Sequence, residues 1–462
     1  MTAARHFAQE FDDRSLHTLY EDHISLTSAI GIDRLNRNLF EQRLFEEIAI
    51  VGRKAKAGSY KFSQYKEKLI SKGAGKHPRV ISIPTFRDRI TLRALCNVLR
   101  RTFEEEIDTK LPQHVIENLR NELRSGKYSH FLKLDVTNFY PSIQHNVLAV
   151  QLKRRVRKKE IIQLITSAIQ TPTLPFPDRL KNTTACGVPQ GLAISNVLAE
   201  IYLAKFDKWA MQIENVAYFR YVDDVLILTQ DEPTRLFELI KSKLEVEYGL
   251  VIHALGSAGK SEIGTVRDRF QFLGYEFRNG FAGVKADSIR RLEASLAKIF
   301  TTYKYRKAAA SAISIAADRN EALTKARKIF LWRLNLRITG CIFDSVRRGW
   351  VFYFSQIDPT SLAQLHHLDK TTNVLARRFS VAFHPKEIRS FARTLHETAR
   401  SNAAHRYIPN FDTTSLATQR EILEMYGMEN VGAMTDEQVN RSFKRRIRRE
   451  TSELELDIQG VS

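Results

Sequence analysis

Hydrophobic and β-branched residues dominate the stretch 218–228, and two adjacent carboxylates, Asp223 and Asp224, interrupt it. Aspartate is a poor strand residue but is well accepted in turns. The pattern therefore predicts two buried strands joined by a tight hairpin, with Val222, Asp223 and Asp224 near its tip. Both acids are expected at the rim of a sheet, although an Asp pair taken alone is usually only a solvated turn.

A second apolar strand, 131–140, is broken by one acid, Asp135, and is followed by a Pro141-Ser142 turn signal. Burying an unpaired carboxylate is costly, so two such interruptions require a common compensation. A pair of divalent cations provides one, because carboxylate oxygens suit Mg²⁺ and two such ions support in-line phosphoryl transfer. Asp135, Asp223 and Asp224 are the predicted ligands.

The rest of the chain alternates between helical and strand patterns. Apolar residues recur at helical spacing over 15–26 and over 33–51, where Asp33 is the predicted N-cap and Gly52 the predicted stop. Further predicted elements are a strand at 79–83, helices at 86–103, 151–159, 197–209 and 234–248, a hairpin at 270–277, a helical region at 287–378 and a C-terminal helix opening at Thr435.

Composition points to a polyanionic partner. The 462 residues carry a formal net charge of +20 and are 43% hydrophobic, which favours a folded, nucleic-acid-binding protein. Three widely spaced cysteines predict neither a disulfide framework nor a zinc site. With no apolar signal core and no apolar run of membrane-spanning length, we expect a cytoplasmic protein that does not enter the membrane.

The two acidic motifs resemble motifs A and C of reverse transcriptases. Asp135 is followed by Phe139-Tyr140-Pro141-Ser142-Ile143. Further along the chain, Asp223 and Asp224 end the motif Tyr221-Val222-Asp223-Asp224, so the two motifs occur in the family's order. The resemblance implies an α+β right-hand polymerase, with fingers and an antiparallel palm sheet flanked by helices, an α-helical thumb and a helical C-terminal extension. The expected parts are an N-terminal helical region (1–60), the fingers and palm (61–285), the thumb (286–380) and an extension of unassigned role (381–462).

The same resemblance assigns roles residue by residue. Arg79, opening an Arg-x-x-x-Ile-Pro-Thr-x-x-Asp-Arg signature, would contact the incoming nucleotide, and a second basic contact is open between Lys72 and Lys76. The Val136 carbonyl would be a further metal ligand, and Tyr140 a steric gate against the ribose 2′-hydroxyl. The remaining assignments are nucleotide contacts at Val136, Phe139, Gln190 and Gly191, a pyrophosphate-protonating Lys260, and a primer grip at Phe272, Leu273, Gly274 and Tyr275.

The predicted function is RNA-directed DNA polymerisation from a primer 3′-hydroxyl with two Mg²⁺ ions, for which Mn²⁺ is a substitute. The partners are an RNA template, with a dedicated non-coding RNA as one option, dNTPs and the DNA product. A partner protein or a second copy of the chain is a further option. Two alternatives stay open: a catalytically inactive RNA-binding or splicing scaffold, and template-independent or protein-primed synthesis.

Leu192 and Asn196 depart from the usual motif B residues, and the segment 198–203 is closer to phage-defence reverse transcriptases. Within the group II intron-like and retron-like superfamily, these departures favour a bacterial defence-associated enzyme of the DRT or Abi type.

Overall fold

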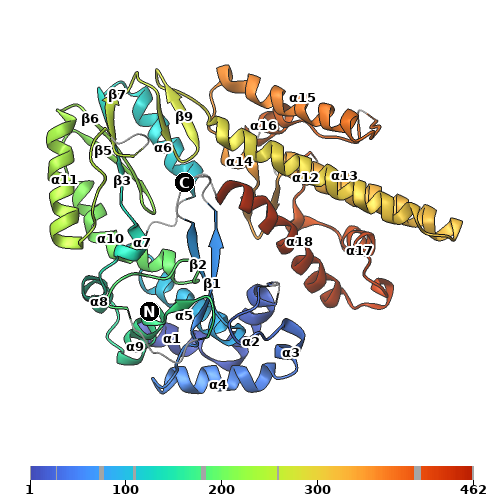
Figure 1. Cartoon of the computed structure of the whole chain (residues 1–462), viewed down its shortest axis with the longest axis horizontal. Helices are drawn as coiled ribbons and strands as arrows, with labels where there is room; N and C mark the ends of the chain where they lie inside the picture. The colour runs from blue at the N-terminus through green and yellow to red at the C-terminus, as the bar shows by residue number, and fades with distance from the viewer. Residues whose placement is uncertain are drawn as a thin grey trace. The chain divides into compact units, whose positions relative to one another are not determined.

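The computed structural model describes residues 2–25, 27, 29–71, 78–107, 111–177, 184–256, 260–384, 386–399 and 407–459. It divides into two compact units, residues 1–110 with 128–264 and residues 111–127 with 265–462 (Figure 1). The chain therefore leaves the first unit at 111, contributes one helix to the second, and returns. The α+β class is confirmed, and the four-part division into 1–60, 61–285, 286–380 and 381–462 stays a prediction.

The first unit is built on a four-stranded sheet of order β5-β6-β3-β7, in which β6 is antiparallel to both β5 and β3. Helices α10 and α11 pack against this sheet. A second sheet, β2-β1-β4, carries the long β1–β2 ribbon. The elements are α1 (Ala3–Glu10), α2 (Asp13–Leu19), the π-helix η1 (Tyr20–Ile24), α3 (Arg37–Glu41), α4 (Leu44–Lys56), β1 (Tyr65–Ile70), β2 (Arg79–Ile83), α5 (Phe86–Thr102), β3 (His130–Asp135), α7 (Phe139–Ser142), α8 (His145–Lys153), α9 (Lys159–Gln170), β4 (Thr173–Leu174), α10 (Ser195–Ala210), β5 (Val216–Tyr221), β6 (Asp224–Thr229), α11 (Pro233–Tyr248) and β7 (Glu262–Thr265).

The second unit is mainly helical. Its elements are α6 (Pro112–Arg124), β8 (Phe270–Phe272), β9 (Tyr275–Arg278), β10 (Phe281–Val284), α12 (Ala286–Ser311), α13 (Ala316–Thr339), β11 (Cys341–Phe343), β12 (Val346–Arg348), α14 (Trp350–Tyr353), the 3-10 turn η2 (Pro359–Ser361), α15 (Leu362–Arg378), α16 (Phe391–Ala399), the 3-10 turn η3 (Phe411–Thr413), α17 (Leu416–Met425), the 3-10 turn η4 (Val431–Ala433) and α18 (Asp436–Gln459). Within the described ranges, every helix is too short or too polar to cross a lipid bilayer.

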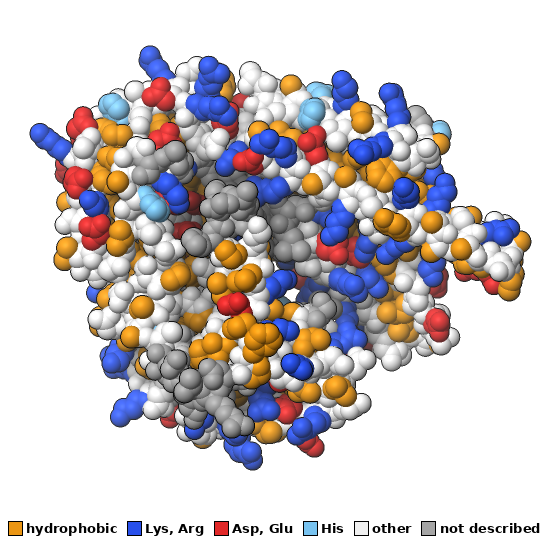
Figure 2. All heavy atoms as spheres, in the orientation of Figure 1, with side chains coloured by type: hydrophobic (Ala, Val, Ile, Leu, Met, Phe, Trp, Pro, Cys, Tyr) orange, Lys and Arg blue, Asp and Glu red, His pale blue; other side chains and the backbone are white. Residues whose placement is uncertain are grey.

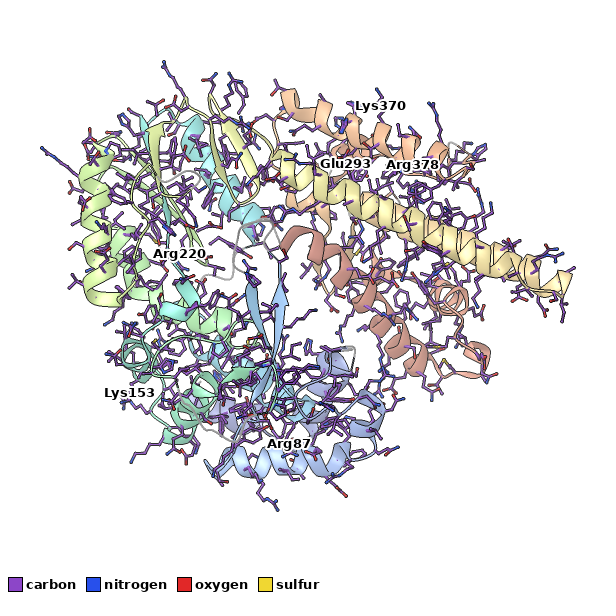
Figure 3. All side chains as sticks on the ribbon, in the orientation of Figure 1. Arg87, Lys153, Arg220, Glu293, Lys370 and Arg378 are labelled. Atoms are coloured by element: carbon purple, nitrogen blue, oxygen red, sulfur yellow. The ribbon has the colours of Figure 1, made fainter. Side chains whose placement is uncertain are left out.

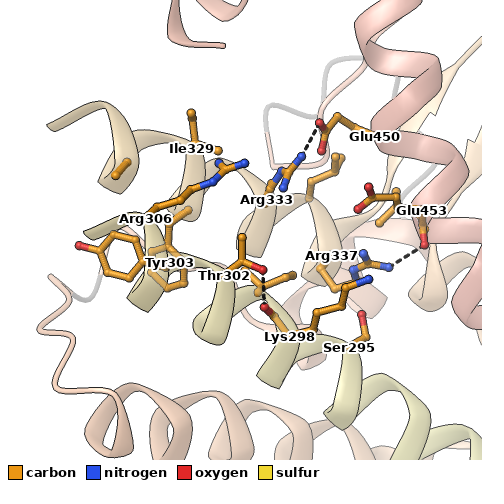
Figure 4. A pocket seen from close by; sticks show the side chains of 15 residues that line it. Ser295, Lys298, Thr302, Tyr303, Arg306, Ile329, Arg333, Arg337, Glu450 and Glu453 are labelled. Atoms are coloured by element: carbon orange, nitrogen blue, oxygen red, sulfur yellow. Dashed lines mark hydrogen bonds and ion pairs between the residues drawn. The ribbon is translucent and has the colours of Figure 1, made fainter. Parts of the chain in front are cut away.

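The C-terminal helix α18 belongs to the core of this second unit. Its apolar face, including Phe443 and Ile447, joins a hydrophobic cluster with Leu336 of α13. Arg333 of α13 pairs with Glu450 of α18 at 2.8 Å, beside a cavity of about 210 Å³ between α12, α13 and α18 (Figure 4). Residues beyond 380 thus complete the packing of the helices that precede them.

Two predictions in the N-terminal region are wrong in detail. The 33–51 segment is two helices, α3 and α4, and Asn36 rather than Asp33 caps α3, accepting from the Leu39 amide at 3.0 Å. Gly52 does not end α4. A Cβ there would lie 2.9 Å from a carboxylate oxygen of Asp13, so Gly52 instead allows α4 to pack closely against α2.

The basic run 151–159 is not a single helix. Helix α8 ends at Lys153 and α9 begins at Lys159. Basic residues four apart would repel one another in a continuous helix. Arg154 and Arg155 instead pair with Glu106, at 2.9 and 2.7 Å, so part of this charge is used within the protein.

The Ile-Pro-Thr-x-x-Asp-Arg stretch has a structural role at the start of α5. Thr85 is the N-cap and accepts from the Asp88 amide, and its hydroxyl donates to the Asp88 carboxylate at 2.8 Å. The buried Asp88 also accepts from the hydroxyl of Tyr60 at 2.8 Å. Burial outweighs these hydrogen bonds and raises the pKa of Asp88 to about 6.

This raised pKa predicts a pH-dependent stability. Asp88 is protonated more readily in the folded chain than in the unfolded chain, whose carboxyl titrates near pH ~3.9, so its contribution is present at low pH and is lost as the pH rises through about 6. Between pH 4.5 and 7.5 we expect the free energy of unfolding of Asp88→Asn to rise by about 2 kcal/mol relative to that of wild type.

Urea unfolding followed by the fluorescence of Trp209, with Trp332 and Trp350 replaced by Phe, measures this change in the first unit. Asp231→Asn, an exposed carboxylate of the same unit, is the control and should keep the wild-type pH dependence. Parallel pH profiles for wild type and Asp88→Asn would contradict the prediction.

Candidate active site

Asp135 and Asp224 face each other across two neighbouring antiparallel strands. Asp135 ends β3, Asp224 begins β6, and the two are register partners. The Asp135 amide donates to Ser261 Oγ at 3.3 Å and its carbonyl accepts from the His253 amide at 3.0 Å, so both backbone groups point away from β6. The two acids therefore form a non-hydrogen-bonded pair, the type in which opposed side chains come closest, with Cα atoms about 4.5 Å apart.

The hairpin between β5 and β6 has a two-residue turn, Val222-Asp223, closed by the pair Tyr221 and Asp224. Val222 has a φ of 58°, while Asp223 is not among the residues with positive φ, which is the type II′ pattern. A β-branched residue in this conformation is strained by about 1–3 kcal/mol. The predicted hairpin is confirmed, and its tip is held in a costly geometry.

The backbone next to Asp135 also directs a carbonyl toward this hairpin. Val136 forms an antiparallel bridge with Ile252, in which Thr137 donates to Val251 and His253 donates to Asp135. In such a bridge the groups of Val136 itself point to the opposite side. The Val136 carbonyl thus faces the side on which Asp223 and Asp224 lie.

Two basic side chains approach Asp135 at one oxygen. Lys260 Nζ lies 2.7 Å and His253 Nε2 lies 3.4 Å from Asp135 Oδ2. Directly opposed like charges destabilise a sheet, so the Lys260 ammonium offsets the repulsion between Asp135 and Asp224. The predicted Lys260 is therefore placed at the acids, and His253 is an addition that the sequence pattern did not reveal.

The donor set fits a hard divalent cation. Two opposed carboxylates, the adjacent Asp223 and a backbone carbonyl are all oxygen donors, and Mg²⁺ typically takes one or two carboxylates together with water and substrate phosphates. Among the described residues, no group of three or more His, Cys, Asp or Glu forms a preassembled metal cage.

Tyr140 lies beside this acidic hairpin. It follows β3 in the short helix α7, and its hydroxyl donates to Asn196 Oδ1 of α10 at 2.7 Å. Burial, with a smaller contribution from the charge of Asp223, raises the pKa of Tyr140. The neighbouring Phe139 is only 2% exposed and packs edge-on against Tyr140 at 5.4 Å, so its ring lies in the core.

The loop before α10 packs against β2. The Ser82 amide donates to the Gln190 carbonyl at 2.7 Å, and Gly191 has a φ of 96°. A Cβ on Gly191 would lie 2.7 Å from Ile81 Cγ2, so only glycine permits this approach. The exposed Arg79 begins the same strand. Its positive charge lowers the pKa of Tyr140, against the larger effect of burial. Lys72 and Lys76 lie outside the described residues.

The predicted primer-grip residues belong to the second unit, as the β8–β9 hairpin. Leu273 and Gly274 form its turn with φ values of 46° and 75°. Tyr275 is fully buried and donates to the Tyr353 carbonyl at 2.6 Å, while the Tyr353 hydroxyl donates to the Leu273 carbonyl at 3.1 Å. Phe272 and Leu273 are also buried, so these side chains hold the hairpin on α14.

The site in the first unit therefore unites Asp135, Val136, Tyr140, Asp223, Asp224 and Lys260, with Arg79, Gln190 and Gly191 on β2 and the adjoining loop. Acids at the rim of a sheet, next to a short helix carrying a tyrosine, are the arrangement that nucleotidyl transfer would require. The family comparison agrees, since residues 70–277 match the family described as "Reverse transcriptase (RNA-dependent DNA polymerase)". Residues 70–277 are therefore a reverse transcriptase domain, and the comparison supports RNA-directed DNA polymerase activity for this segment.

Individual relatives are distant. Protein YkfC of Escherichia coli K12 is 24% identical over 293 residues, which are 53% of this chain and 74% of YkfC. The group II intron-encoded protein LtrA of Lactococcus lactis subsp. cremoris is 25% identical over 177 residues, 37% of this chain but only 29% of LtrA. Among solved structures, telomerase from Candida albicans with a fragment of telomeric RNA aligns with a TM-score of 0.39 and 15% identity, covering 85% of this chain and 69% of that one.

Proposed function

We propose that the protein extends a primer 3′-hydroxyl with dNTPs on an RNA template, using Asp135, Asp223 and Asp224 as its metal-binding acids. The observation that carries this proposal is the direct opposition of Asp135 and Asp224 beside the strained hairpin that presents Asp223. Two bound Mg²⁺ ions, or Mn²⁺ in their place, would supply activation of the 3′-hydroxyl and charge neutralisation of the triphosphate.

Residues of the protein itself bind and orient the substrates. The Val136 carbonyl and the carboxylates orient the reacting groups, and Arg79 on β2 binds triphosphate oxygens, for which its planar donors are suited. Lys260, close to Asp135, is placed to donate a proton to the departing pyrophosphate once substrate separates it from that carboxylate. Phe139 supports the ring of Tyr140 from the core, and Gln190 and Gly191 form the floor beside β2.

An RNA partner agrees with the charge. Lys and Arg total 72 against 52 Asp and Glu, and Figure 2 shows basic side chains spread over the visible face.

A primer-extension assay on defined RNA and DNA templates, with labelled dNTPs, tests the proposal. DNA product made only with template supports it. Product without template, or attached to protein, would favour the untemplated or protein-primed alternative, and RNA binding without product would favour the scaffold.

We further propose an antiviral setting, which rests on the departures at Leu192 and Asn196. Host cells carrying the intact gene should resist phage infection, and cells carrying an Asp224→Asn copy should not. Equal plaque counts for both genes would separate the polymerase activity from defence.

Sugar selection provides a further prediction. Replacing Tyr140 by Ala removes the ring that we place against the ribose 2′-position, so incorporation of ribonucleotides relative to deoxynucleotides should rise by about tenfold or more, equivalent to about 1.4 kcal/mol. Single-nucleotide kcat/KM ratios measure the effect.

Tyr140→Phe is the matched control, because it keeps the ring and loses only the hydrogen bond to Asn196. This variant should retain wild-type selectivity. A Tyr140→Ala enzyme that still rejects ribonucleotides as wild type does would remove the gate role.

A further inference from the structure

Arg220 lies on β5, two residues before the turn, with its side chain only 5% exposed (Figure 3). All five of its N–H donors have acceptors. Nε and Nη2 donate to Asp207 at 2.7 and 2.6 Å, and Nη1 and Nη2 donate to Glu200 at 3.2 and 2.7 Å. The fifth donor, on Nη1, binds the Val222 carbonyl at 2.8 Å.

Both carboxylates come from α10, the helix that also carries Asn196, the partner of Tyr140. Glu200 and Asp207 are seven positions apart on one face of that helix, and their side chains are 17% and 15% exposed. Asp207 also accepts from the Tyr218 hydroxyl at 2.7 Å. The network is therefore anchored on α10 and on β5, and its only backbone acceptor among these contacts is in the acidic hairpin.

Stability alone is a weak reason for such a network. Taking charges out of water is costly, and apolar side chains of similar volume often replace a buried ion pair without loss. An apolar side chain cannot, however, bind the Val222 carbonyl. Because the peptide group is planar, fixing this carbonyl also fixes the amide of Asp223 and thus the direction in which the first hairpin acid leaves the turn.

We propose that Arg220, held by Glu200 and Asp207, is a positioning residue that keeps the strained Val222-Asp223 turn in the geometry required for catalysis. This inference rests on the proposed polymerase function. Arg220 touches no substrate and acts only through the turn.

The test separates positioning from stability by removing the charges together. In Arg220→Met/Glu200→Gln/Asp207→Asn no buried charge is left unpaired, so the urea midpoint of unfolding should stay near that of wild type. The kcat of primer extension should nevertheless fall by about 10- to 100-fold, with KM for dNTP changed by less than about threefold, because small misplacements of reacting groups cost rate.

Glu47→Gln is the control. Glu47 is a buried carboxylate of the same unit that pairs with Arg87, and its loss should lower the unfolding midpoint without changing kcat. Arg220→Lys is a second variant, which keeps the charge but has three donors for five contacts. This variant should fold, and its kcat should be lower than that of wild type.

A folded variant at position 220 with wild-type kcat overturns the inference, as does a triple variant whose loss lies only in its unfolding midpoint. These outcomes are distinct from failure of the proposed function. In that case the wild-type protein itself, assayed beside Asp224→Asn, would show no metal-dependent extension.

Discussion

Asp224→Asn is expected to lower primer extension by at least about a thousandfold, equivalent to about 4 kcal/mol of transition-state stabilisation. The amide keeps the size of the side chain but removes the charge that would hold a cation opposite Asp135. Because it also relieves repulsion between two opposed acids, the variant should be as stable as wild type or slightly more stable. Extension rates and urea unfolding of the same preparation measure both effects.

The control is Asp231→Asn, an exposed acid just beyond the other end of β6, which should leave extension unchanged. Extension by Asp224→Asn within tenfold of wild type would show that the chemistry takes place elsewhere. Loss of stability in step with activity would instead make Asp224 a structural residue.

Asp358→Ala is expected to destabilise the second unit by about 3–5 kcal/mol. Asp358 is buried and accepts from Arg120 at 2.6 Å, from Arg124 at 2.8 Å and from the Ala282 amide at 2.6 Å. Removing the carboxylate leaves Arg120, whose side chain is 10% exposed, as a buried charge without its main counter-ion. Trp332 and Trp350 report unfolding of this unit when Trp209 is replaced by Phe.

Arg124→Ala is the matched control for this prediction. Its side chain is 57% exposed, so the loss of its contact with Asp358 should cost about 1 kcal/mol or less. If Asp358→Ala costs no more than Arg124→Ala, the carboxylate does not hold α6 in this unit.

The acidic strands could be predicted from sequence because their signals are local. Alternation of side chains and the turn preference of aspartate are enough to place Asp135 in a strand and Asp223 in a hairpin. The predicted strand 131–140 is wrong beyond Asp135, because β3 ends there and the short helix α7 begins at Phe139. The same local signals located β2 and α5. The roles of Tyr140 and Lys260 came from the resemblance to reverse transcriptases and not from a local signal. The structure places both side chains beside the acids, and their roles stay predictions.

Contacts between distant segments had no such signal. Nothing around His253 indicated that its ring would approach Asp135, because that contact depends on a bridge between residues 136 and 252. Gly191 was assigned a nucleotide contact from the resemblance, and nothing in the local sequence indicated that its missing side chain also makes room for Ile81 of β2. Arg154 and Arg155 of the basic run are neutralised by Glu106, an acid nearly fifty positions earlier in the chain.

The insertion of α6 into the second unit was also missed, since an amphipathic helix of thirteen residues gives no indication of which core it joins. This placement matters for anyone who dissects the protein. A recombinant fragment cut at residue 265 would separate Asp358 from Arg120, and would therefore be expected to misfold for a reason unrelated to the catalytic acids. A chimera that borrows these C-terminal helices must bring residues 111–127 with them.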